Sequence, residues 1–416
     1  QQIKFEEYDL PNGLHVILHQ DNSAPVVTTS VMYHVGAKDE AAGRTGFAHF
    51  FEHLLFEGTK NIKRGEWFKI VSSNGGSNNA NTSPDRTYYY ETFPSNNEQL
   101  GLWMEAERLR HPVINQIGVD TQREVVKEEK RLRIDNQPYG GLFNAILTTL
   151  FKKHPYKGTV IGSMEDLNSA KLEEFNAFFK KYYIPNNATL VVAGDIKPEQ
   201  TKKWINEYFG SIPKGTPITR NFPKETPITQ EFEETVYDAN IQIPAYIFAY
   251  RTPAVKERDA YILEMLGSYL SRGKSSVLYK KLVDNEKKAL AVEAFSLGLV
   301  DHSIFAFFAI PMGNTSKDVL KKDIDAEIKK LQTDLISEED YQKLQNQVEN
   351  NFVNANSSVQ GIANTLADSY LLKGNTNLIN EEINIYRSIT REDLRNAARK
   401  YLNSNQRAII NYLPKN

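Results

Sequence analysis

The sequence predicts an α+β protein made of two homologous domains, each an α/β sandwich in which an antiparallel-rich sheet is covered by helices. Three observations support this class. Short strand patterns are interspersed with amphipathic helical patterns, the C-terminal part of the chain repeats the first half, and a proline-rich stretch separates the two copies. The predicted limits are residues 1–212 for the first domain, 213–230 for the linker and 231–416 for the second.

Internal similarity is clearest where each half ends in a helix followed by a strand. LEEFNAFFKKYYIPNNATLVVAGD in the first half parallels REDLRNAARKYLNSNQRAIINYLP at the C-terminus, with Lys181-Tyr182 matching Lys400-Tyr401. The second copy begins with the strand-like stretch PAYIFAYRTP and a helical pattern, DAYILEMLGSYLSRG, that has no histidine. Gene duplication therefore accounts for the two domains.

Individual elements follow from periodicity and from turn residues. Strands are expected at both ends of the stretch 5–19 and at 26–35, 77–82, 86–93, 189–193 and 244–253. Helices are expected at 46–57, 64–73, 96–110, 116–135, 141–151, 169–183, 198–208, 258–271, 316–332 and 337–356. Residues 213–230 show no periodicity, which is typical of a linker.

Composition excludes several classes of function. The 416 residues carry a formal net charge of −2, without the basic surface that nucleic-acid binding needs, and no apolar run is long enough to span a membrane. The absence of cysteine excludes disulfides and thiol catalysis, so a zinc site must use histidine and carboxylate. A cysteine-free chain that begins with Gln1 rather than Met favours an exported protein, for example a periplasmic one.

A metal motif lies in the helix expected at 46–57. His49, Glu52 and His53 form H-x-x-E-H, which places both imidazoles on one face of a helix with a carboxylate beside them. The eight histidines and 52 acidic residues of the chain would produce this pattern by chance roughly 0.02 times. A pair of surface histidines is the alternative, but the phenylalanine- and leucine-rich flanks predict a buried helix, in which two histidines and a glutamate need a partner such as a metal.

A third ligand is expected from the helix at 116–135. The candidates are Glu124, Glu128 and Glu129. Val125, Glu129 and Leu132 follow an i, i+4, i+7 spacing, so Glu129 is predicted to lie in a buried apolar stripe, with Gln122 on its face one heptad earlier. The other two glutamates fit a solvated face.

These motifs resemble the pitrilysin family of inverzincins, and particularly its two-domain branch of roughly 400 residues that includes the β subunit of mitochondrial processing peptidase. The similarity extends over nearly the whole chain, through LPNGLHVILHQDNSAPVV, HFFEHLLFEGTK, NANTSPDRTYYY, REVVKEE, HPYKGTVIG, YYIPNNATLVVAGD, GKSSVLYKKL and ITREDLRNAARKYL.

The resemblance implies a zinc-dependent endopeptidase with one zinc per chain. His49, His53 and Glu129 would be the ligands, and Glu52 the general base that activates water. Asn79 and Ala80 would lie on an edge strand that pairs with the peptide substrate. The resemblance also implies a clam-shell chamber that admits peptides or unfolded segments.

The chain departs from the family pattern in two respects. The family usually has Glu seven residues before the third ligand, where this chain has Gln122, whose amide can still hydrogen-bond behind the ligands. Active relatives also carry an Arg-x6-Tyr pair that contacts substrate, and the equivalent stretch DNEKKALAV has Asn285 and Val292 there. The chain is therefore expected to be the zinc-bearing subunit of a heterodimer whose partner supplies that pair, with a homodimer as the other possibility.

Two readings from other classes remain. The missing pair also fits a non-catalytic scaffold, like the core subunits of respiratory complexes that share this fold, although a scaffold has no need for the four metal-site residues. A peptide-binding module with structural zinc is less consistent, because structural zinc sites usually have four protein ligands.

Overall fold

The structure, a computed structural model, describes residues 2–416, which form two compact units. Unit 1 consists of residues up to 130, 158–222 and 353–380. Unit 2 consists of residues 131–157, 223–352 and 381–416. Each unit therefore contains a segment from the other half of the sequence. The predicted domain limits were drawn from the sequence repeat, whereas the compact units are defined by contacts in the folded chain. The limits therefore stay a prediction.

Unit 1 is built on a six-stranded mixed sheet with the order β1-β2-β6-β3-β5-β4. Its strands are β1 (Glu6–Asp9), β2 (His15–Gln20), β3 (Val26–Tyr33), β4 (Ser77–Thr82), β5 (Thr87–Pro94) and β6 (Ala188–Gly194). Strands β2 and β6 are parallel, and the other neighbours are antiparallel. Strand β6 is the buried strand that the run TLVVA predicted, and β4 forms one edge of the sheet.

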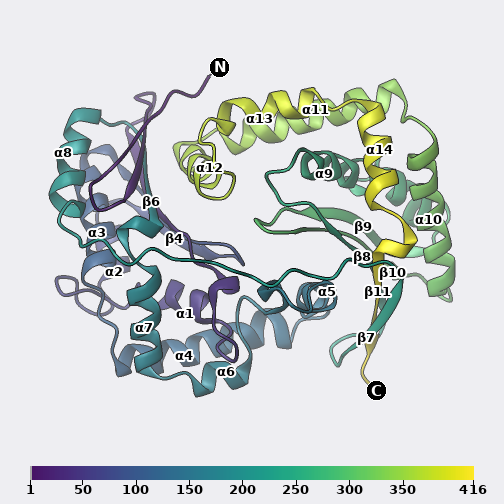
Figure 1. Cartoon of the computed structure of the whole chain (residues 1–416), viewed down its shortest axis with the longest axis horizontal. Helices are drawn as coiled ribbons and strands as arrows, with labels where there is room; N and C mark the ends of the chain where they lie inside the picture. The colour runs from purple at the N-terminus through teal and green to yellow at the C-terminus, as the bar shows by residue number, and fades with distance from the viewer. Residues whose placement is uncertain (1) are drawn as a thin grey trace. The chain divides into compact units, whose positions relative to one another are not determined.

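Helices cover both faces of this sheet, as Figure 1 shows for β6, which lies between α12 and the pair α3 and α8. The helices of unit 1 are α1 (Phe47–Leu54), α2 (Trp67–Ser73), α3 (Glu98–Arg110), α4 (Gln116–Lys130), α6 (Met164–Ser169), α7 (Leu172–Tyr182), α8 (Pro198–Phe209) and α12 (Val359–Leu371). Alternation decides the faces, since side chains of consecutive strand residues point to opposite sides. Val16 and Leu18 enter the core with α1 and α7, whereas Ile17 enters the core under α12.

Unit 2 has a five-stranded sheet with the order β7-β11-β8-β10-β9. Its strands are β7 (Phe232–Asp238), β8 (Ala245–Thr252), β9 (Ala289–Leu297), β10 (Ser303–Pro311) and β11 (Arg407–Pro414). Its helices are α5 (Leu142–Leu150), α9 (Arg258–Ser271), α10 (Lys317–Thr333) and α14 (Arg391–Tyr401). Two of the boundaries between the units fall inside helices, namely α11 (Glu338–Ala355) and α13 (Leu378–Arg387).

The two sheets share one topology, which confirms the predicted fold class. In each sheet a parallel pair, β2 with β6 or β7 with β11, is followed by three antiparallel neighbours. Helix α5, from the first half of the chain, covers β8 and β11 of unit 2. Helix α12, from the second half, covers the equivalent strands of unit 1. The repeat therefore built two similar sheets, and each is completed by a helix from the other half of the sequence.

Most predicted elements are present, with shorter ends. The helix expected at 46–57 spans only Phe47–Leu54, and the one expected at 116–135 is α-helical to Lys130 and then continues as a π-turn over Arg131–Asp135. The single helix expected at 169–183 is wrong at its start, since α6 ends at Ser169 and α7 begins at Leu172. Among residues 2–416, no helix is both long and apolar enough to cross a membrane.

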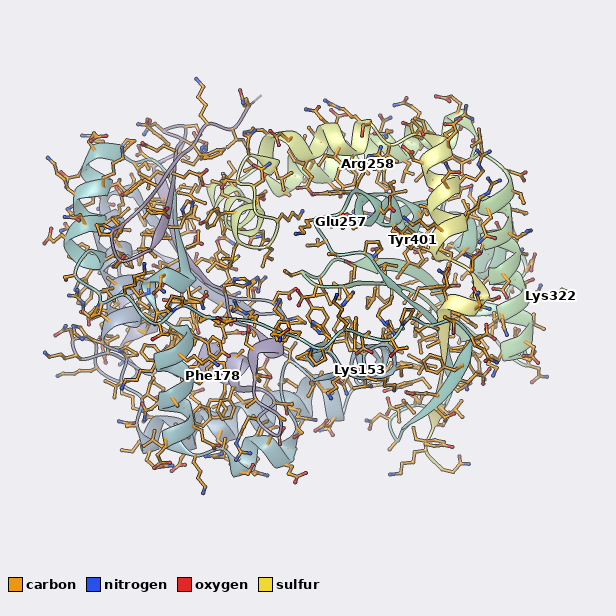
Figure 2. The ribbon with its side chains drawn as sticks, in the orientation of Figure 1. Lys153, Phe178, Glu257, Arg258, Lys322 and Tyr401 are labelled. Atoms are coloured by element: carbon orange, nitrogen blue, oxygen red, sulfur yellow. The ribbon has the colours of Figure 1, made fainter. Side chains whose placement is uncertain are left out.

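Residues 213–229 of the predicted linker form no helix or strand, and specific hydrogen bonds hold them. Within unit 1, the amide of Asn186 bonds the backbone of Gly215 in both directions, at 3.0 and 2.9 Å. Within unit 2, one carboxylate oxygen of Glu225 accepts the backbone N–H groups of residues 152–154, and Lys153 at the centre of this set is labelled in Figure 2. The linker is therefore anchored at both of its ends.

Candidate metal centre

Helix α1 owes its position to aromatic packing against α7. Phe47 stacks on Phe175 with ring centroids 4.5 Å apart, and Phe51 stacks on Phe178 at 5.4 Å. Figure 2 labels Phe178 on α7 within this cluster. An isolated helix of eight residues is unstable in water, because so few hydrogen bonds offset the cost of nucleation. The aromatic contacts with α7 therefore supply the stability that α1 would not have by itself.

A close backbone contact and a carboxyl group hold the N-terminus of α1. Gly46 has φ +92°, and a Cβ there would lie 2.7 Å from the carbonyl oxygen of Ile161 and 2.8 Å from the Cα of Gly162. The two oxygens of Glu40 accept the N–H groups of Gly46 and Ala48 at 3.1 and 2.8 Å. Burial raises the pKa of Glu40 well above its usual value, although these two hydrogen bonds oppose the shift.

The C-terminus of α1 is held by two buried donors. The Tyr89 hydroxyl donates to the carbonyl of Phe51 at 2.8 Å, and Arg108 Nε donates to the carbonyl of Leu55 at 3.2 Å. The Arg108 guanidinium is also paired with Glu105 at 2.6 Å, and both side chains are essentially inaccessible to solvent. It lies 4.1–4.6 Å from the ring centroids of Phe56, Trp67 and Tyr89. A cation is favourable at this end of a helix.

The three side chains predicted as metal ligands converge. Glu129 Oε2 lies 3.0 Å from His53 Nε2 and 3.6 Å from His49 Nε2, and one ligand atom from each residue lies within 4.8 Å of the others. Neighbouring ligand atoms of a tetrahedral zinc site are about 3.3 Å apart, given Zn–N and Zn–O distances near 2.0 Å. The donor set therefore fits zinc in both chemistry and spacing. Within the described part of the chain, this is the one group of His, Asp or Glu side chains that could hold a metal.

The predicted apolar stripe of α4 is wrong, although Glu129 reaches the cluster. Val125 and Leu132 are 44% and 57% exposed, whereas Val119 and Val126 are fully buried. Glu129 follows Val126 by three residues and Val125 by four, so it borders both valine faces of the helix. Packing against the region of α1 buries the face of α4 that carries Val119 and Val126. Residue spacing on α4 alone does not show which of the two faces is buried.

Glu52 points from α1 towards the edge strand β4. The Thr82 hydroxyl donates to Glu52 Oε2 at 2.6 Å. Burial raises the pKa of Glu52, and the nearby Glu129 carboxylate adds to this shift, while the Thr82 hydrogen bond and the positive charges of His53 and Arg86 oppose it. A carboxylate in this setting binds a proton more readily than an exposed glutamate does.

Strand β4, which carries Asn79 and Ala80, lies at one edge of the sheet. Among the described residues it pairs with β5 alone, with Asn79 opposite Tyr90 and Ala80 opposite Tyr89. Asn79 is exposed, and its side-chain oxygen accepts the backbone N–H of Ala80 at 2.9 Å. Ala80 packs partly against the core, and Thr82, two residues on, shares its side of the strand.

Gln122 lies on α4 two turns before Glu129, and its amide nitrogen donates to Glu57 Oε1 at 2.6 Å.

The positions expected for the Arg/Tyr pair lie in unit 2. Asn285 is exposed at the end of a π-helical segment, Tyr279–Asn285, and Val292 is 4% exposed in the core of β9.

Comparison with known proteins identifies the family. Residues 15–163 match the model of "Insulinase (Peptidase family M16)", and residues 169–348 match that of the "Peptidase M16 inactive domain". The chain is 32% identical over 412 residues to "Zinc protease PqqE" of Helicobacter pylori, covering 98% of this chain and 92% of that protein. This chain belongs to peptidase family M16. All predicted metal-site residues of this M16 chain lie in the part matched by the insulinase model.

Structural comparison agrees with this assignment. The crystal structure of a protease from Helicobacter pylori matches this M16 chain with a TM-score of 0.94 at 30% identity over the full length of both chains. The first half of the periplasmic protease PqqL from Escherichia coli matches at a TM-score of 0.79 and 19% identity, covering 99% of this chain and 92% of that one, which shows the shared fold. The probable β subunit of the mitochondrial-processing peptidase of Arabidopsis thaliana is 23% identical over 320 residues, covering 74% of this chain and 60% of that protein.

Sequence reasoning missed four side chains that hold this site. They are Glu40, Thr82, Tyr89 and Arg108. Thr82 stands in the N-A-x-T stretch and shares the strand face of Ala80, so alternation could have identified it. Tyr89 stands in the same NANTSPDRTYYY stretch, but nothing in the sequence shows which carbonyl its hydroxyl reaches. Glu40 lies in the loop just before α1, where no capping motif marks it. Arg108 is more than 50 residues from α1 in the sequence, which hides its role.

Replacement of Arg108 by Met is expected to destabilise unit 1 by about 3–5 kcal/mol, because it leaves the buried Glu105 carboxylate unpaired. Urea unfolding measures the loss. Met at Arg110, which is partly exposed on the same helix, is the control and should cost less than about 1 kcal/mol. Adding Glu105→Gln to Arg108→Met should recover much of the loss. An Arg108→Met protein as stable as the parent would contradict this role.

Proposed function

We propose that this chain is a zinc-dependent endopeptidase that hydrolyses peptides or unfolded segments. The observation that carries the proposal is the convergence of His49, His53 and Glu129 beside a glutamate, Glu52, that is hydrogen-bonded to an edge strand. Kinship with proteins named zinc proteases supports the same reaction class.

His49, His53 and Glu129 would hold one zinc ion per chain, and three protein ligands leave the fourth position open, as catalytic sites require. Zinc bound there would polarise a peptide carbonyl and lower the pKa of a bound water. Glu129 lies between the two imidazoles, so its carboxylate offsets part of the positive charge of the ion. The rigid α1 helix presents both histidines without a loop between them.

Glu52 would act as the general base. Its carboxylate takes a proton from the attacking water and then delivers one to the leaving amine. The raised pKa suits the first of these steps, because a carboxylate with a higher proton affinity is a stronger base than an ordinary glutamate. Thr82 donates to one carboxylate oxygen and so leaves the other available.

Strand β4 would bind the substrate. An extended peptide can add to a free sheet edge through backbone hydrogen bonds, which gives affinity with little sequence preference. The backbone N–H of Ala80 now donates to the side-chain oxygen of Asn79. In the complex it would donate to a backbone carbonyl of the substrate instead. Because Thr82 lies on the same strand, peptide binding at Asn79 and Ala80 would occur beside the base.

We further propose that a same-fold partner completes the active enzyme. Asn285 and Val292 offer neither the charge nor the hydroxyl that would stabilise an oxyanion. Similarity to a protein named as a subunit of a processing peptidase supports a heterodimer, and a homodimer is the second possibility. A clam-shell chamber and an exported, for example periplasmic, location belong to the same proposal. The cysteine-free composition is consistent with export.

The second candidate function is a non-catalytic scaffold, which the match to the inactive-domain model favours. Zinc content separates it from the enzyme. The purified chain is expected to contain one zinc, and Glu52→Gln should retain that zinc yet lose at least about 100-fold in cleavage of a quenched peptide. Metal analysis and fluorescence measure the two quantities. Absence of zinc from the unmodified chain would place the scaffold first.

Thr82→Val removes the hydroxyl at nearly constant shape, so Glu52 loses its hydrogen bond. We expect kcat to fall by about tenfold while KM and zinc content stay within about twofold of the parent values. Thr82→Ser keeps the donor and is the matched control. A Val variant with the parent kcat would remove Thr82 from the mechanism, as would equal losses in both variants.

The partner proposal predicts weak peptidase activity for the isolated chain and a large increase when a same-fold protein carrying the Arg and Tyr is added. Activity of the chain alone that falls on dilution would indicate a homodimer. Strong activity that is independent of protein concentration would exclude the need for any partner.

A further inference from the structure

Helix α4 is tied to the segment that follows α1 through one buried carboxylate. Glu57 Oε1 accepts from Gln122 Nε2 at 2.6 Å, and Glu57 Oε2 pairs with Arg64 Nε at 2.5 Å. The Glu57 side chain is only 8% exposed. An ionised carboxylate can only accept hydrogen bonds, so the amide of Gln122 must direct its nitrogen towards Glu57.

The contact extends over neighbouring turns of α4. A Cβ at Gly118, one turn before Gln122, would lie 3.5 Å from Glu57 Cγ, so Glu57 rests directly on the helix backbone. Arg64 also donates to the Thr121 hydroxyl at 2.8 Å. These contacts join the chain immediately after His53 to the helix that carries Glu129.

Gln122 lies on the face of α4 that contains the third ligand. Gln122, Val126 and Glu129 follow the spacing i, i+4, i+7, and Val126 is fully buried. A fixed position of Gln122 therefore fixes the rotation and height of Glu129, which lies about two turns, or roughly 10 Å, further along the helix.

We propose that Gln122 is a positioning residue whose amide holds α4 against Glu57 and so sets the distance between Glu129 and the two histidines. This inference rests on the proposed zinc site, and it assigns Gln122 a partner other than the metal ligands. The chain has an amide at this position because a carboxylate faces it. Glutamate here would place two carboxylates at hydrogen-bonding distance, with Arg64 as their shared cation.

The test exchanges the two groups. Gln122→Glu is expected to weaken zinc binding by about tenfold in chelator competition and to lower the Tm of the metal-free protein by about 2 °C. The double variant Glu57→Gln with Gln122→Glu restores an amide opposite a carboxylate, so its zinc affinity should return to within about twofold of the parent value. Glu57→Gln alone keeps an acceptor oxygen for Gln122 and is the control, with a loss of less than about threefold.

Two results would overturn the inference. Zinc binding or kcat that is unchanged or improved in Gln122→Glu would mean that this side chain acts towards the metal site instead of towards Glu57. A double variant no better than Gln122→Glu would mean that the pair is not responsible. If the parent chain binds no zinc, the proposed function fails, while the Tm values of the four metal-free proteins still decide whether the pair holds α4.

Discussion

Helix α1, which carries the predicted ligands His49 and His53, is only eight residues long, so the candidate site depends on what holds its two ends. Glu40 accepts the N–H groups at the start of the helix, and Arg108 and Tyr89 donate to carbonyls at its end. Glu40 satisfies N–H groups that a helix leaves without an intrahelical partner, whereas the Tyr89 hydroxyl adds a second donor to the Phe51 carbonyl, which already accepts the N–H of Leu55. Because these anchors come from a loop, α3 and β5, the orientation of both histidines is a property of the whole of unit 1.

The need to anchor both ends of α1 also explains why charged groups are buried around the site. Arg108 is enclosed by three aromatic rings and pairs with Glu105, while burial and the neighbouring Glu105 raise the pKa of Glu91 well above its usual value. This shift favours the neutral form of Glu91, which beside one carboxylate and one guanidinium would leave the cluster without net charge. Such a neutral set can be buried behind α1 at a much lower cost than an unpaired ion.

Duplication produced two sheets of one topology, but over residues 2–416 the candidate metal ligands lie in unit 1 alone. The equivalent helix α9 has no histidine, and in unit 2 the buried Arg407 pairs with Glu231 and Asp325. The exchange of α5 and α12 between the sequence halves means that neither half supplies a complete unit by itself. Cooperation of both halves is therefore required for each sheet to bury its two faces.

The sequence alone determined the fold class, the repeat and the helix that carries H-x-x-E-H, because each depends on local spacing or on a repeat. It also predicted His49, His53 and Glu129 as metal ligands, and this role stays a prediction although the three side chains converge. It predicted the wrong buried stripe on α4, since Val125 and Val126 both lie beside Glu129 and only packing selects between them. Tertiary structure decided that choice, together with the exchange of α5 and α12, the anchoring of α1 by Glu40 and Arg108, and the pairing of Gln122 with Glu57. Except for the contact of Glu40, these join residues that are distant in the chain, and helical or strand periodicity carries no information about which distant surface an element will meet.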